Sequence, residues 1–63
     1  MPIVTIQQSP RDLDRKRRLV AAITDAFVEA DDVRPEHVQV FIHEVGYDYW
    51  AKGGRLAVDS KQS

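Results

Sequence analysis

Residues 1–8 read MPIVTIQQ, and this stretch decides the fold. Its run of Ile, Val and Thr is rich in β-branched side chains, which predicts a strand from Pro2 to Gln8. Pro2 is unusual at the start of a strand because proline fixes φ and removes a backbone donor. Pro2 is therefore either a strand-edge residue or a residue that matters for its ring nitrogen.

A long helix is predicted directly after this strand. Ser9 suits the N-cap, Pro10 suits the first helical position, and Asp12 completes a capping pattern. The helix is expected to end at about Ala30 or Asp31. Apolar residues at spacings of three and four predict one buried stripe along it. The stripe contains Leu19, Ile23, Ala26, Phe27 and Ala30, and it is widened by Leu13, Val20 and Val28.

A second strand is predicted from Val38 to Val45. It follows a break at residues 31–35, where Pro35 pushes Arg34 out of the helical region, and a short turn over residues 35–37. Gln39 and every second residue after it should face one side, and Val38 and its alternates the other. A right-handed crossover would make the two strands parallel neighbours. The fold class is therefore α/β (α+β), with a β-α-β protomer.

The tail from Gly46 to Ser63 is predicted to form a short hairpin or arm. Gly53-Gly54 is a turn signal, and a short segment over residues 55–58 follows it. Three of the five aromatic residues of the chain lie at residues 47–50, where they would form an exposed patch typical of an interface or binding site. Residues 59–63 are expected to be frayed.

Composition limits the class of protein. With 63 residues and no cysteine, the chain is expected to be one domain over residues 1–63 that associates with copies of itself, because so small a core is marginal. A net charge of −1 argues against nucleic-acid partners, and the basic run at residues 15–18 is interpreted as a solvated helix face. Without an apolar run long enough for a membrane span or a secretory signal, we expect no membrane partner and a cytoplasmic location.

The ring nitrogen of Pro2 becomes chemically useful once Met1 is removed. It is then a free secondary amine, and α-amino groups have an ordinary pKa of about 8. Burial, or a nearby arginine, would lower that pKa further by disfavouring the charged form. A base poised near neutral pH suits proton abstraction next to a carbonyl group. While Met1 remains attached, the nitrogen is an amide and cannot act as a base.

The order and spacing of these features resemble the 4-oxalocrotonate tautomerase family over nearly the whole chain. The resemblance begins with the Pro-Ile-Val-Thr-Ile start and Arg11 just before the helix. It continues through the helical residues 16–30, Pro35, residues 38–44, Trp50, Gly53-Gly54 and Leu56-Ala57. Each motif is weak alone, and together they are specific.

The resemblance implies a β-α-β protomer, dimers, and a hexamer built from three dimers. It implies a cofactor-free and metal-free site in which Pro2 is the general base and the substrate is a small enol or unsaturated keto acid. Arg11 would bind a substrate carboxylate, and Trp50 would form an apolar wall. A second arginine would come from a neighbouring subunit to polarise the carbonyl group.

The chain departs from the family at two positions. Gln39 stands where the second arginine is common, so it would donate a neutral hydrogen bond, about half as strong as a charge-assisted one. Trp50 replaces the usual phenylalanine. Both changes favour a smaller or monoacid enol, such as an arylpyruvate-like compound, over a dicarboxylate.

Two alternatives stay open. One is a hydratase or dehalogenase of the same superfamily, with Asp48 or Glu44 activating water. The other is a non-catalytic oligomeric scaffold whose site has decayed at Gln39. His37 and His43 have no known metal-ligand spacing, although His43 shares a strand face with Gln39 and could approach a pocket.

Overall fold

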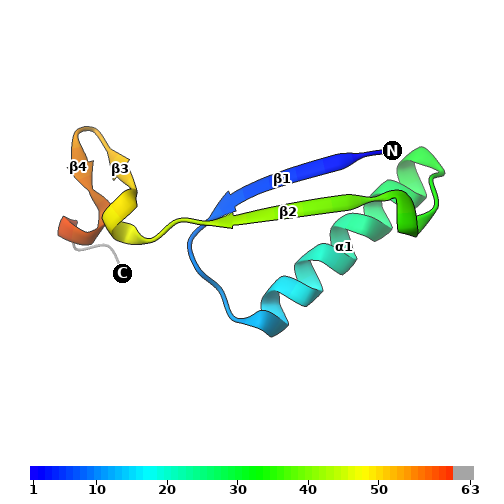
Figure 1. Ribbon diagram of the computed structural model, residues 1–63, viewed down its shortest axis with the longest axis horizontal. Helices are drawn as coiled ribbons and strands as arrows, with labels where there is room; N and C mark the ends of the chain where they lie inside the picture. The colour runs from blue at the N-terminus through cyan, green and yellow to red at the C-terminus, as the bar shows by residue number, and fades with distance from the viewer. Residues whose placement is uncertain (61–63) are drawn as a thin grey trace.

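The computed structural model describes residues 1–60 as a β-α-β unit followed by a separate hairpin (Figure 1). Within residues 1–60, short 3₁₀ helices at Pro35–His37 and Tyr47–Tyr49 connect longer elements, and another at Ala57–Asp59 follows the last strand. The longer elements are β1 (Ile3–Gln8), α1 (Leu13–Asp31), β2 (Gln39–Glu44), β3 (Ala51–Lys52) and β4 (Arg55–Leu56). The predicted strands were therefore one residue too long at the start of β1 and at both ends of β2.

The two long strands pair in parallel, as predicted. Their register runs from Ile3 opposite Gln39 to Gln8 opposite Glu44. The bond from the Val45 N–H to the Gln8 carbonyl, at 2.9 Å, extends the pairing past β2. Figure 1 shows α1 running back along this strand pair to connect the end of β1 to the start of β2. The strand pair therefore has two distinct ends, one at the N-terminus and one at the start of α1.

The predicted start of the helix was wrong. Asp12 is the N-cap of α1, and its carboxylate accepts a hydrogen bond from the Arg15 N–H at 2.8 Å. Ser9 does not cap the helix because its hydroxyl accepts a bond from the Arg11 guanidinium, and Ser9 is only 8% exposed. A short polar side chain suits either role, and the local path of the chain decided between them.

The predicted end of the helix was right. Asp32 caps α1 in the left-handed region, with φ 60°, and its N–H bonds to the Val28 carbonyl. The chain then makes the expected turn at Pro35–His37 before β2 begins.

The faces of the strand pair alternate as predicted. Val4, Ile6, Val40 and Ile42 are half-buried. Figure 1 shows α1 along one side of the strand pair, so we infer that these four side chains face α1. Residues at the alternate positions are exposed on the opposite face, with Ile3 61% and Phe41 52% exposed. Apolar residues therefore occupy both faces, but a single protomer covers only one of them.

The C-terminal hairpin, called the arm here (residues 46–60), confirms the predicted turn. Gly53 and Gly54 have φ of 61° and 77°, a pair of conformations typical of a two-residue hairpin turn. The turn pairs Ala51 with Leu56 and Lys52 with Arg55 in an antiparallel ladder. Of the residues expected to be frayed, Asp59 lies in a 3₁₀ helix and Ser60 bonds to the Ala57 carbonyl, and residues 61–63 lie outside the described part of the chain.

The protomer is elongated and, within residues 1–60, contains no fully buried apolar side chain. Its dimensions are 44 × 23 × 15 Å, and its radius of gyration is 15.1 Å. A compact domain of this length would have a radius of gyration of about 11 Å. The described part of the chain contains no helix long and apolar enough to cross a membrane. The shape leaves the protomer without a core of its own.

Candidate active site

Pro2 and Gln39 meet at the N-terminal end of the strand pair. The Gln39 N–H donates to the Pro2 carbonyl at 3.0 Å, and the Gln39 side-chain amide donates to the Met1 thioether at 2.9 Å. Pro2 is half-buried, and Gln39 is exposed. The register of the strands therefore brings two of the residues singled out from the sequence to the same point.

Arg11 lies at the other end of β1. Its guanidinium donates to the Ser9 hydroxyl and to the Pro10 carbonyl, the latter at 2.9 Å. Its backbone N–H donates to the Glu44 carboxylate at 3.2 Å. These bonds hold Arg11 in the segment just before α1. The two bonds from the guanidinium use only part of its five N–H donors.

Glu44 joins the end of β2 to the start of α1. Its carboxylate forms an ion pair with the Lys16 ammonium at 2.9 Å, in addition to the bond from Arg11. The Lys16 hydrogen bond, followed by the Arg11 backbone bond, lowers the pKa of Glu44 from its ordinary value. A carboxylate whose ionised form is stabilised in this way is a weak base, so its role here is to fix the backbone near Arg11.

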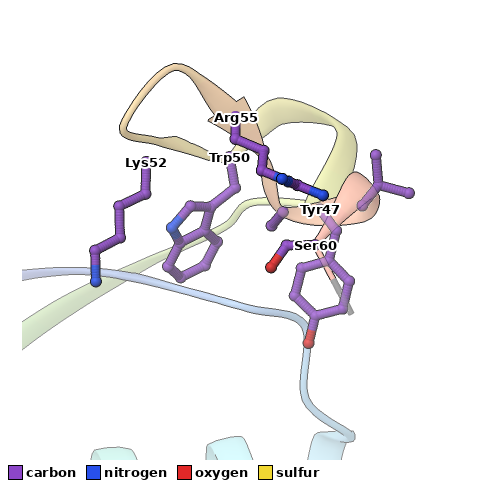
Figure 2. Close-up of a pocket in the computed structure, with 7 residues that line it drawn as sticks. Tyr47, Trp50, Lys52, Arg55 and Ser60 are labelled. Atoms are coloured by element: carbon purple, nitrogen blue, oxygen red, sulfur yellow. The ribbon is translucent and has the colours of Figure 1, made fainter. Parts of the chain in front are cut away.

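The arm contributes a hollow of about 820 Å³. Figure 2 draws the lining side chains and labels five of them, with Trp50 and Tyr47 directed to the same side of the hairpin as Arg55. Trp50 is 39% exposed and Tyr47 is 55% exposed, so both present aromatic surface. The complete lining is Tyr47, Trp50, Lys52, Arg55, Ala57, Val58 and Ser60.

Two basic residues of this hollow were missed in the sequence. Lys52 and Arg55 flank the Gly53-Gly54 turn and lie directly opposite each other in the ladder. The signal was available, because a two-residue hairpin turn pairs the residues on either side of it.

One protomer does not bring all the predicted site residues together. Pro2 and Gln39 lie at one end of β1, and Arg11 lies just past the other end. A strand of this length spans about 20 Å. Trp50 belongs to the arm, which Figure 1 shows beyond the carboxyl end of β2. The two ends of the sheet thus carry different halves of the candidate site.

Comparison with known proteins identifies the family. The model of the tautomerase enzyme family matches residues 2–59. This chain belongs to the tautomerase family.

Curated relatives of this tautomerase-family chain match it over almost its full length. It is 35% identical to the 2-hydroxymuconate tautomerase of Bacillus subtilis over 60 residues, covering 94% of this chain and 97% of that protein. It is 33% identical to a probable tautomerase of Halalkalibacterium halodurans, covering 94% and 98%.

The fold agrees with a solved structure of the same family. A crystal structure of a 4-oxalocrotonate tautomerase homologue superposes with a TM-score of 0.89 at 30% identity, covering 98% of this chain and all of that chain. The fold class and the resemblance inferred from the sequence are therefore confirmed.

The remaining titratable candidates of this tautomerase-family chain lie apart. His43 pairs with Gln7 on the exposed face of the sheet, and His37 lies in the turn before β2. Asp48 lies in the 3₁₀ helix of the arm. Within residues 1–60, no three metal-ligating side chains gather into a group that could hold an ion.

Proposed function

We propose that this protein is a cofactor-free tautomerase that moves a proton within an enol or unsaturated keto acid. Pro2 would be the general base after Met1 is removed, and Arg11 would bind the substrate carboxylate. Gln39 would donate a hydrogen bond to the substrate oxygen, and Trp50 would form the apolar wall. Family membership and the position of Gln39 beside Pro2 support these assignments.

The single observation that carries the proposal is the contact of the Gln39 amide with Met1. The amide nitrogen lies 2.9 Å from the Met1 sulfur, at the residue whose removal would free the Pro2 nitrogen. Removal of Met1 would leave this donor without its thioether acceptor, beside a new amine. A base and a neutral donor at one point are what proton transfer at a carbonyl or enol group requires.

The proton balance of the reaction is simple. The Pro2 amine would take the proton of the enol hydroxyl while the oxygen begins to form the carbonyl. The resulting ammonium would return a proton to the neighbouring carbon, which would restore the free amine. The amide of Gln39 would stabilise charge on the substrate oxygen during both steps, although a neutral donor does so less than a cation.

The active site would be assembled from more than one protomer. Pro2 and Arg11 lie at opposite ends of a strand about 20 Å long, so a small substrate cannot touch both within one chain. A protomer without a buried apolar side chain in residues 1–60 also needs partners to be stable. We therefore propose a homo-oligomer in which the N-terminal end of one protomer meets the arm end of another, with a hexamer of three dimers as the expected form.

The hydratase or dehalogenase alternative has less support. Glu44 is held by Lys16 and by the Arg11 backbone, and its pKa is lowered. Activating water would require a carboxylate with a raised pKa and access to the Pro2 amine. Glu44 lacks the first property, because Lys16 and the Arg11 backbone N–H stabilise its ionised form.

The test is a ketonisation assay on a panel of enol acids, with Pro2→Ala and Arg11→Ala beside the wild type. Arg17→Ala is the matched control, because Arg17 lies on the exposed surface of α1 in an ion pair with Asp14. We expect Pro2→Ala and Arg11→Ala to lose at least about a hundredfold in kcat/KM. Intact mass should show that Met1 is absent from the active protein. Equal rates for all four proteins, or full activity with Met1 attached, would overturn the proposal.

A further inference from the structure

The arm carries a concentration of positive charge that the tautomerase mechanism above does not use. Lys52 and Arg55 lie directly opposite each other in a ladder of only two residue pairs. Like charges placed opposite each other across strands destabilise a hairpin. Neither residue forms an ion pair with a carboxylate in residues 1–60, whereas Arg15, Lys16, Arg17 and Arg34 each do. The hairpin therefore keeps two adjacent cations whose mutual repulsion is not offset by an ion pair within residues 1–60.

The Arg55 guanidinium is held in place and still has donors to offer. One of its terminal nitrogens donates to the Asp59 carbonyl at 3.1 Å. A guanidinium has five N–H donors in a planar fork, which matches the two oxygens of a carboxylate. The single bond to Asp59 orients the side chain and leaves the rest of the fork for a ligand.

The surroundings of Arg55 suit the body of an organic acid as well as its charge. Trp50 and Tyr47 provide aromatic walls, and Ala57 and Val58 provide aliphatic surface in the same hollow. The Ala57 N–H bonds to the Trp50 carbonyl at 2.6 Å, which ties these two walls together. Figure 2 shows the Arg55 and Tyr47 side chains approaching each other, with the Trp50 ring between them and Lys52.

We propose that this hollow supplies Arg55 as a second anchor, in addition to Arg11, for the carboxylate of an aryl-substituted or similarly apolar acid, with Lys52 as a further positive charge. The inference rests on the proposed function, since the acid would be the tautomerase substrate. Arg55 of this hollow carries a positive charge, whereas Gln39, at the other end of the sheet, is neutral. Arg55 would then set the preference for acids over neutral enols.

The binding test uses the only tryptophan of the chain, Trp50, as the reporter. The probes are 3-phenylpropionate and its uncharged amide, which share a phenyl ring and do not react. Quenching of Trp50 fluorescence gives the Kd of each probe for the wild type and for Arg55→Gln, Lys52→Gln and Arg17→Gln. We expect Arg55→Gln to raise the Kd of the acid by about tenfold to a hundredfold and to leave the Kd of the amide unchanged.

The two other variants separate charge from folding. Lys52→Gln removes the cross-strand repulsion, so it should fold at least as well as the wild type and still bind the acid more weakly. Arg17→Gln should bind both probes as the wild type does. Equal changes for acid and amide, or no change in either, would overturn the proposal. A changed oligomer mass with an unchanged Kd would overturn it too, because the hollow would then be a subunit contact.

A parallel assay keeps this inference distinct from the proposed function. KM and kcat are measured for phenylenolpyruvate and for its methyl ester, with the same variants. We expect Arg55→Gln to raise KM for the acid about tenfold, with kcat within about threefold and the ester unaffected. Binding that depends on Arg55 without any turnover would refute the tautomerase proposal and retain the anion site. Turnover with the same KM and kcat in Arg55→Gln as in the wild type would refute the anion site and retain the tautomerase proposal.

Discussion

The β-α-β unit and the arm are built in different ways. The unit has six register pairs between β1 and β2, a capped helix and an ion pair that ties Glu44 to Lys16. The arm has two register pairs and a turn of two glycines. Aromatic and basic side chains with large exposed surfaces surround them. The β-α-β unit is thus ordered mainly by backbone hydrogen bonds. The arm has little regular backbone pairing and carries exposed aromatic and basic side chains. We expect removal of apolar side chains from the unit to change stability more than removal of apolar side chains from the arm.

The largest stability effect is expected in the unit. Ile42→Ala removes a half-buried side chain from the face under α1 and should lower the free energy of unfolding by about 2 kcal/mol. Val58→Ala in the arm, where the side chain is 59% exposed, should change it by less than about 0.5 kcal/mol. The measurement is denaturant unfolding at one fixed protein concentration, because association shifts apparent stability. Equal losses of unfolding free energy in Ile42→Ala and Val58→Ala would mean that the two regions do not differ in their contribution to stability.

A backbone change should affect the arm locally. Gly54 has φ 77°, so Gly54→Ala should destabilise the hairpin by about 1–2 kcal/mol, although a Cβ there would meet no neighbouring atom. Gly54→Asn is the matched control, since asparagine tolerates this conformation better. Hydrogen exchange should show faster opening of the Ala57 N–H in Gly54→Ala, with no change in β1 and β2. Faster exchange in both regions would mean that they open together.

The helix cap gives a smaller effect. Asp12→Ala removes the acceptor for the Arg15 N–H and should cost about 1 kcal/mol of stability. Asp12→Asn keeps a capping oxygen and should recover most of this loss. Thermal unfolding of the three proteins measures it. If Asp12→Ala unfolds as the wild type does, another group satisfies the start of α1.

The smallest effect is expected at Glu44, and it depends on pH. The lowered pKa of Glu44 means that its ion pair stabilises the fold above the ordinary glutamate range and is lost as pH falls through the lowered pKa. The unfolding midpoint of Glu44→Gln should lie below that of the wild type at about pH 7, and the difference should shrink by about pH 3. A difference that is constant with pH would mean that Lys16 and Glu44 are not coupled.

Most of the fold could be predicted from the sequence, because its signals are local. Alternation in residues 38–45 and the helical stripe gave the correct order of elements, and right-handed crossover gave parallel strands. The helix start was missed because Ser9 and Asp12 are both good capping residues. Sequence preference does not decide between two such candidates three residues apart. The path of the chain through Pro10 decides between them, because it directs the Ser9 hydroxyl toward the Arg11 guanidinium.

The candidate site was less predictable for a physical reason. The pairing of Gln39 with the N-terminus follows from a register that the sequence pattern does not specify. In the proposed oligomer, the positions of Arg11 and Trp50 relative to Pro2 depend on contacts between chains, which hydrophobic periodicity in one chain does not encode. The pairing of Lys52 with Arg55 can be predicted from the two-residue hairpin turn alone. Its exposure beside Trp50 became evident only in three dimensions.

The placement of Pro2 and Arg11 at opposite ends of β1 has a genetic consequence. Suppose that each catalytic centre takes its base, Pro2, from one chain and its cation, Arg11, from another. In an oligomer that mixes chains lacking Pro2 with chains lacking Arg11, the two defects then fall in the same centre at some positions and in different centres at others. Co-expressed, the two inactive variants would form hybrids containing some centres with both intact halves. Two alleles that are null when alone would then complement each other.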